Sequence, residues 1–129
     1  MSRIVVTGMG VISAIGNTVE ENRAALIKGR CGITTLENFS SRFAGVIPCG
    51  EIKITTDTLK QQLNAHEQGV TRTMLLSLHA VNEALADSKL SADEITSFNT
   101  AFINGNTVGG MCLTDEFYAD AHCKANGSE

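Results

Sequence analysis

Cys112 is the residue best placed in this sequence to act as a nucleophile. It follows a predicted strand and a glycine-rich loop, and it precedes a predicted helix. The positive end of a helix lowers the pKa of a thiol and makes the thiolate more available. Nucleophilic catalysis also needs a base, and none of the three histidines has a spacing that indicates pairing with Cys112. The residues therefore favour a buried structural cysteine, and we predict no catalytic residue in this chain.

The histidines are predicted to pack or to face solvent. His79 falls in the longest predicted helix, where a partly buried packing residue is more frequent than a base. His66–Glu67 falls in a predicted loop, and the adjacent pair His122–Cys123 makes a poor chelate without further ligands. The four cysteines are Cys31, Cys49, Cys112 and Cys123. They form no CxxC pair, so we predict no metal site and reduced thiols.

Gly8-Met9-Gly10 follows a predicted strand and precedes a helix, which is the setting of a dinucleotide-binding loop. The third glycine of that fingerprint is missing, because Ser13 occupies its place. The acidic residue expected about 20 positions further on is also missing, since Lys28–Arg30 occupies that region. The pattern therefore favours glycines that serve a tight turn, and we predict no cofactor.

Capping residues and apolar spacing predict the helices. Thr18 with Glu21, and Ser91 with Glu94, have the spacing of capping boxes. The predicted helices are one that follows Thr18 and stops at Gly29, one over Asp57–Leu63, a long one over Arg72–Ser88, a short turn after Ser91, and a last one capped by Thr114 that continues through Ala121.

The long predicted helix has two distinctive stripes. Its larger apolar residues fall on one face, namely Met74, Leu78, Val81 and Leu85. Ala80 and Ala84 form a strip of small residues that can accept close packing against another element. Helix 72–88 is therefore the predicted centre of the packing.

Three short apolar segments predict strands. Ile4–Val6 ends in the glycine segment, and Thr100–Ile103 ends in Asn104–Gly110. Phe43–Ile47 is predicted to be an edge strand, which Pro48 ends because proline lacks a backbone donor. Strands that alternate with helices indicate the α/β class.

Composition excludes several classes of function. The 129 residues are enough for one domain, and the contents of 43% hydrophobic and 19% charged residues are those of a globular chain. A net charge of −4 with 10 basic residues gives no cationic field, so no nucleic-acid partner is predicted. No apolar run approaches the roughly 20 residues of a membrane span. The first residues lead directly into a strand pattern, which favours a cytoplasmic protein without a signal peptide.

Three segments in order carry a resemblance to a known family. They are Val5–Thr18 (VVTGMGVISAIGNT), the alanine-rich Leu76–Asp87, and the glycine-rich Gly105–Gly110. Together they resemble the β-ketoacyl-acyl-carrier-protein synthases, the condensing enzymes of types I and II. The resemblance implies a thiolase-like α/β fold, built from two similar halves that stack as five layers. Residues 1–129 resemble the N-terminal portion of the first half, and therefore an N-terminal fragment of the enzyme.

The resemblance also implies a function for the longer parent enzyme. Family members join an acyl chain, held as a thioester on a cysteine, to a malonyl-carrier protein with loss of carbon dioxide. The catalytic cysteine and two histidines of the family match no segment of this chain, so the fragment is expected to be inactive. Val108, with Thr107 and Gly109, is expected to line the acyl-binding pocket. Acyl carrier protein is the implied partner, and the fragment is expected to self-associate near the Phe102 strand and the Phe117 helix.

Two residues depart from the family pattern. Thr107 replaces a usual glycine of the pocket segment, and Lys89 replaces the usual glycine after the long helix. Lys89 must therefore adopt a left-handed conformation at an energetic cost, or the helix must end differently. These departures leave open a fatty-acid synthase, a divergent synthase for polyketides or polyenes, and a non-catalytic dimerisation module that resembles a chain-length partner.

Overall fold

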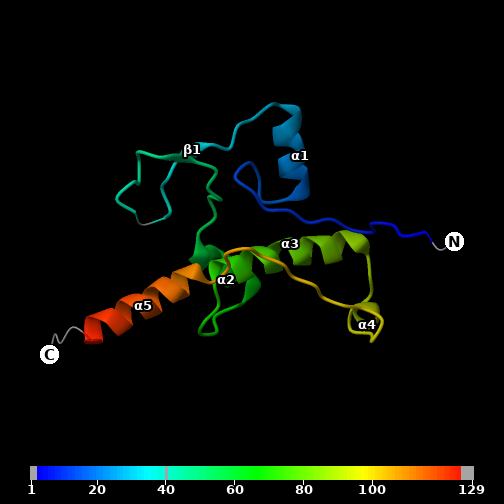
Figure 1. Cartoon of the computed structure of the whole chain (residues 1–129). Helices are drawn as coiled ribbons and strands as arrows, with labels where there is room; N and C mark the ends of the chain where they lie inside the picture. The colour runs from blue at the N-terminus through cyan, green and yellow to red at the C-terminus, as the bar shows by residue number, and fades with distance from the viewer. Residues whose placement is uncertain (1–2, 40, 126–129) are drawn as a thin grey trace.

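Helices dominate the chain. The computed structural model describes residues 3–39 and 41–125, without the side chains of Cys112, Lys124 and Ala125. The elements, in chain order, are α1 (Val19–Ile27), β1 (Thr34–Thr35), β2 (Pro48–Cys49), α2 (Thr56–Leu63), α3 (Arg72–Ser88), α4 (Ala92–Ile95) and α5 (Met111–Ala125). Figure 1 shows α1 and β1 on one side of α2 and α3, with α5 projecting from the other elements. No helix within the described ranges is long and apolar enough to cross a membrane.

The core lies where α2 packs against α3. Leu59 of α2 and Leu75 of α3 are fully buried, and Ala65 lies between the two helices in the sequence and is buried with them. Burying one leucine side chain contributes about 1.5–3 kcal/mol, so these two residues are the main apolar anchors of the pair. The apolar face predicted for helix 72–88 is therefore wrong in part. Met74 and Leu78 are 51% and 40% exposed, and the neighbouring Leu75 is the anchor.

Capping decides where the helices begin. The predicted bounds of α2 and α3 hold to within one residue, with Thr55 and Thr71 as the N-caps. The capping box of Ser91 and Glu94 is complete. At α1, Thr18 accepts from the Glu21 backbone N–H, but the Glu21 carboxylate accepts from Asn17 N at 2.7 Å and not from Thr18.

Two further predictions concern Lys89 at the end of α3 and Thr114 at the start of α5. Lys89 follows α3 with φ 57° and ψ 21°, so it adopts the left-handed conformation instead of changing where the helix ends. The predicted cap of the last helix is wrong, since α5 begins at Met111 and Thr114 lies within its first turn. There the Thr114 hydroxyl donates to Gly110 O at 3.4 Å.

The three predicted strands do not form. Ile4 and Ile103 are 99% and 90% exposed, and neither Ile4–Val6 nor Thr100–Ile103 belongs to a strand. A strand needs a hydrogen-bonded neighbour, and among the described residues these segments have none. Phe43–Ile47 forms turns around Gly45, whose φ is 76°. Gly45 N donates to Leu36 O and Ile47 O accepts from Leu36 N, but the strand itself begins at Pro48.

The sheet of the described residues has two strands. β1 and β2 run antiparallel, with Thr34 opposite Cys49 and Thr35 opposite Pro48. Pro48 therefore begins a strand where it was predicted to end one. The central mixed sheet implied by the family resemblance stays a prediction.

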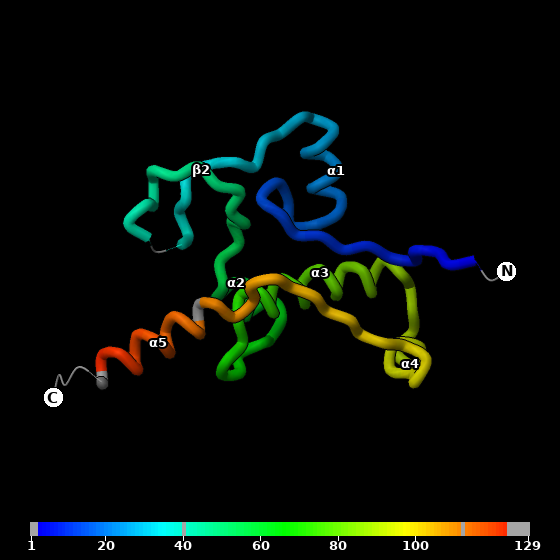
Figure 2. Tube along the Cα trace, viewed as in Figure 1, coloured from blue at the N-terminus to red at the C-terminus, as the bar shows by residue number. Residues whose placement is uncertain are grey.

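The glycines at the N-terminus serve close packing against α3. Gly8 and Gly10 lie in an extended segment, so the predicted tight turn is wrong. A Cβ atom on Gly8 would lie 2.6 Å from Ser88 N, and one on Gly10 would lie 2.8 Å from Ala84 N. Ala80 and Ala84 accept this segment, as their small side chains predicted, and Figure 2 shows the segment running along α3.

Candidate functional site

The segment 105–110 is the loop that leads into α5. The Asn106 side chain holds it in a turn, because its Oδ1 atom accepts from Gly109 N at 2.8 Å. Gly110 has φ 89°, a value that glycine adopts without the steric cost of a Cβ atom. Met111 N donates to Val108 O at 3.4 Å. The loop is therefore closed by its own sequence, and it presents Val108 just before the first residue of α5.

Two neighbouring hollows lie between this loop, the first turn of α3 and α5. The larger has a volume of about 340 Å³ and is lined by Thr56, Val70–Thr73, Val108, Gly110, Met111, Leu113 and Glu116. The smaller has a volume of about 230 Å³ and is lined by Thr71, Thr73, Met74, Asn104, Asn106, Gly109, Gly110 and Leu113. Val108 lines the first and Gly109 the second, whereas Thr107 is exposed and lines neither.

The walls of the larger hollow suit an apolar chain. Val70, Val108 and Met111 contribute aliphatic or thioether groups, and Arg72 and Glu116 add charged groups. Pockets of this kind bind through apolar walls and use a few polar groups for orientation. The described lining offers no thiol and no imidazole. Among its described lining residues, the hollow therefore offers apolar walls without a pair of thiol and imidazole.

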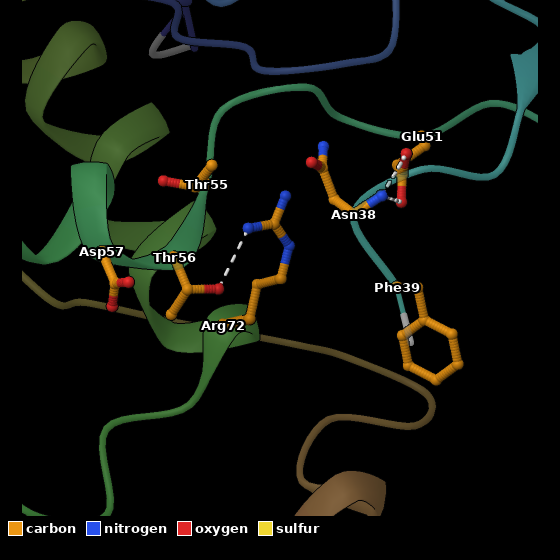
Figure 3. A pocket seen from close by; sticks show the side chains of 7 residues that line it. All are labelled: Asn38, Phe39, Glu51, Thr55, Thr56, Asp57 and Arg72. Carbon is orange, nitrogen blue, oxygen red and sulfur yellow. Dashed lines mark hydrogen bonds between the residues drawn. The ribbon is translucent and has the colours of Figure 1, made fainter. Parts of the chain in front are cut away.

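A third hollow, of about 290 Å³, surrounds Arg72 on the side of the β1–β2 hairpin (Figure 3). The Arg72 guanidinium donates to Thr56 Oγ1 at 3.2 Å, and to Ile52 O and Ile54 O at 2.9 Å each. These bonds tie the start of α3 to the segment before α2. Arg72 is thus occupied in joining elements, which favours a structural role for this hollow.

Glu51 lies in the same hollow and fastens the hairpin. Its carboxylate accepts from Glu37 N at 3.0 Å and from Asn38 N at 2.9 Å, and it lies 3.5 Å from Lys53 Nζ. Burial raises the pKa of Glu51, but the backbone donors of Asn38 and Glu37 and the charge of Lys53 together hold that pKa below its ordinary value. The Glu51 carboxylate is therefore charged at neutral pH. Both of its oxygens accept hydrogen bonds from the backbone of this chain.

The other cysteines and histidines do not form a cluster among the described residues. The side chain of Cys112 lies outside the described part of the structure. The other cysteines are free thiols: Cys31 and Cys123 are exposed, and Cys49 is half-buried. His66 is exposed in the loop before α3, and the His122 ring packs against the Tyr118 ring at a tilt of 53°, with a centroid distance of 4.1 Å. Across residues 3–39 and 41–125, no group of three metal-ligating side chains gathers.

His79 is half-buried and packs, as predicted. Its Nε2 atom lies 2.8 Å from Asn17 O. Sequence reasoning missed two partners on the same face of α3, Glu83 and Asp87, which bind backbone N–H groups of the N-terminal segment. The available signal was their spacing, because positions 79, 83 and 87 differ by four and so share one face of a helix. In the described part of the chain, no hydrogen bond joins a histidine to a cysteine.

Comparison with known proteins places this sequence in a family. Residues 1–127 match the family described as beta-ketoacyl synthase, N-terminal domain. The chain is 35% identical over 121 residues to 3-oxoacyl-[acyl-carrier-protein] synthase 2 of Vibrio harveyi, which is 88% of this chain and 27% of that protein. It is 34% identical over 121 residues to the synthase 2 of Vibrio cholerae, with the same shares covered. It is 29% identical over 125 residues to synthase 1 of Escherichia coli K12, which is 94% of this chain and 29% of that protein.

These matches cover much of this chain and little of the relatives. The chain spans 27% to 29% of the length of the three synthases named above. No solved structure matches it. Because the family match extends over nearly the whole sequence, its assignment does not depend on a single motif. The chain belongs to the β-ketoacyl synthase family, as part of its N-terminal domain, for which the family implies a thiolase-like fold.

Proposed function

We propose that this chain is part of a 3-oxoacyl-[acyl-carrier-protein] synthase and contributes one wall of its acyl-binding site. The whole enzyme would join an acyl thioester to malonyl-carrier protein. The bond from malonyl C2 to its carboxylate breaks and releases carbon dioxide, while C2 forms a bond to the acyl carbonyl carbon. The enzyme thiolate leaves, and the product is a 3-oxoacyl-carrier protein.

The observation that carries this proposal is the position of Val108. A loop closed by Asn106 and Gly110 presents this aliphatic side chain to a hollow that Met111 and Val70 also line. The side chain is 65% exposed, so it does not plug a core within this chain. Gly109 lines the neighbouring hollow. Thr107 lines neither hollow, so its proposed contribution is to the loop that carries Val108.

The reaction centre would be supplied by other parts of the enzyme. The described side chains include no thiol hydrogen-bonded to an imidazole, and thiol catalysis needs a base positioned beside the nucleophile. We therefore propose that the chain by itself does not catalyse condensation. The names of the relatives make acyl carrier protein the proposed partner and fatty-acid synthesis the proposed pathway.

Exposed apolar side chains indicate a surface that another protein surface covers. That surface belongs either to the rest of the synthase or to another copy of this chain. The large apolar side chains that are at least 65% exposed include Ile4, Val5, Val6, Phe98, Phe102, Ile103, Phe117 and Tyr118. Soluble proteins cover apolar surface of this extent at interfaces. We propose that the chain alone self-associates through the segment of Phe102 and the α5 helix of Phe117.

Val108→Phe in the complete synthase tests the acyl-site proposal. The larger ring fills part of the hollow, so the longest accepted acyl chain should shorten while condensation of short chains is nearly unchanged. The measurement is the ratio of kcat/KM for long and short acyl-carrier proteins. Val46→Phe is the matched control, because Val46 is 72% exposed in the turn before β2. Equal losses at all chain lengths would refute the assignment of Val108.

A further inference from the structure

The attachment of α1 to the rest of the molecule is unusual. No Cα atom of α1 lies within 8 Å of a Cα atom in another described helix or strand. Its position must therefore be set by side chains and by the segment that precedes it. Three side chains of α3 bind that segment, and they lie at successive turns of the helix: His79, Glu83 and Asp87.

The three contacts run antiparallel to the chain they hold. His79 Nε2 is 2.8 Å from Asn17 O, Glu83 accepts from Val11 N, and Asp87 Oδ2 accepts from Met9 N at 3.0 Å. All three contact backbone groups of the segment. Gly8 and Gly10 let that backbone approach α3 closely enough for these bonds to form.

Glu83 differs from the other two because it uses both carboxylate oxygens. Oε2 accepts from Val11 N at 2.9 Å, and Oε1 accepts from Val19 N at 2.7 Å. Val19 is the first residue of α1, so its N–H has no acceptor within its own helix. One side chain therefore closes the loop 11–19 at both ends and caps α1 from outside.

The other bonds of this region join the loop 11–19 to α1 and to Arg30, which lies just after α1. Asn22 is 7% exposed, and its Nδ2 donates to Gly16 O at 2.9 Å and to Thr18 O at 2.8 Å. Arg30 donates to Ile15 O. These bonds shape the loop but do not connect it to α3. The side-chain hydrogen bonds to α3 come from the face formed by residues 79, 83 and 87, and Ile12 adds an apolar contact with the core of α2 and α3.

We infer that Glu83 is a positioning residue that couples loop 11–19 and α1 to α3. Its carboxylate binds both ends of the loop, so the order of the loop and of the first turn of α1 depends on α3. Without Glu83, α3 and its core with α2 stay folded, and the loop opens locally. The inference concerns the glycine segment and α1, so it stands apart from the acyl-site proposal for Val108.

Amide hydrogen exchange of the 129-residue chain, resolved by residue with NMR, tests this inference. Glu83→Ala removes both acceptors and keeps high helix propensity in α3. Exchange at Val11 and Val19 should accelerate roughly tenfold to a hundredfold, since a hydrogen bond to a charged acceptor is about that strong. Exchange at the buried Leu75 should be unchanged. Asn82→Ala is the matched control, because it shortens the neighbouring exposed polar side chain of the same helix.

Two outcomes would overturn the inference. One is unchanged exchange at Val11 and Val19, and the other is equal acceleration at these residues and Leu75. Glu83→Gln gives an independent test if the alanine variant fails to fold. Glutamine keeps one acceptor oxygen, so one of the two amides should lose protection and the other should keep it. Loss at both amides or at neither would contradict the bidentate role.

Discussion

Replacing Lys89 with glycine should stabilise the chain. Lys89 follows α3 with φ 57° and ψ 21°, a left-handed conformation in which the Cβ atom crowds the following carbonyl oxygen. That crowding costs about 1–2 kcal/mol for a residue other than glycine. Glycine removes the crowding but loses about 0.5–1 kcal/mol more conformational entropy on folding. The net gain expected for Lys89→Gly is therefore about 0.5–1 kcal/mol.

Urea unfolding followed by circular dichroism at 222 nm measures this gain. The midpoint should rise while the slope with urea concentration stays constant, which indicates a change in stability alone. Lys28→Gly is the matched control, because Lys28 ends α1 in a right-handed conformation with φ −83°, where glycine should destabilise. Asn64→Gly should have a smaller effect than Lys89→Gly, since asparagine adopts the left-handed conformation of Asn64 at lower cost. A Lys89→Gly variant no more stable than Lys28→Gly would refute the reasoning.

Three further outcomes follow from the packing, the hairpin and the exposed surface. Gly10→Ala should destabilise the chain by about 1–3 kcal/mol in the same unfolding assay, because its Cβ atom would overlap the α3 backbone; a smaller loss than at the open position Gly105→Ala would contradict this. Because the pKa of Glu51 is lowered from 4.5, the bonds from Asn38 and Glu37 should be fully present above that pH and lost as the pH falls through the lowered value. NMR shifts of these two amides should show this transition, and Glu51→Gln should abolish it. Light scattering should show self-association that Phe117→Ser weakens, whereas a monodisperse monomer at high concentration would contradict it.

Local sequence signals predicted the helices well. The bounds of α3 and the capping box of Ser91 and Glu94 depend on residues within a few positions of one another, so a short window of sequence contains the cause. Ala80 and Ala84 also predicted close packing, because small side chains on one face of a helix let another segment of backbone approach it. They do not identify the partner, because the glycines of that partner, Gly8 and Gly10, predict a tight turn from their own sequence.

Features that depend on distant residues could not be predicted in this way. Ile4–Val6 has strand composition but no strand, because pairing is decided by a neighbour and not by the segment itself. Leu75 is buried in place of Met74 because α2 approaches that side of α3. Glu83 binds amides 72 and 64 positions away in the sequence, so its role follows from the tertiary structure alone.

At the Val108 site, too, the loop could be predicted from nearby residues and the hollow could not. The glycines of segment 105–110 indicated an adaptable loop, and the resemblance indicated an acyl site. The hollow itself is made by residues from α2, α3 and α5 that no local pattern connects. Thr107, which the family pattern grouped with Val108, lies outside both hollows.

We propose that this chain contributes a ligand-binding wall to a condensing enzyme whose reaction centre is supplied by other parts of the protein. The decisive assay is condensation of acyl-carrier protein with malonyl-carrier protein by the purified 129-residue chain, with release of carbon dioxide and formation of the 3-oxoacyl product both measured. We expect no turnover above that of a Cys112→Ala variant, because among the described side chains no imidazole is hydrogen-bonded to a thiol. Turnover that the Cys112→Ala substitution abolishes would contradict it.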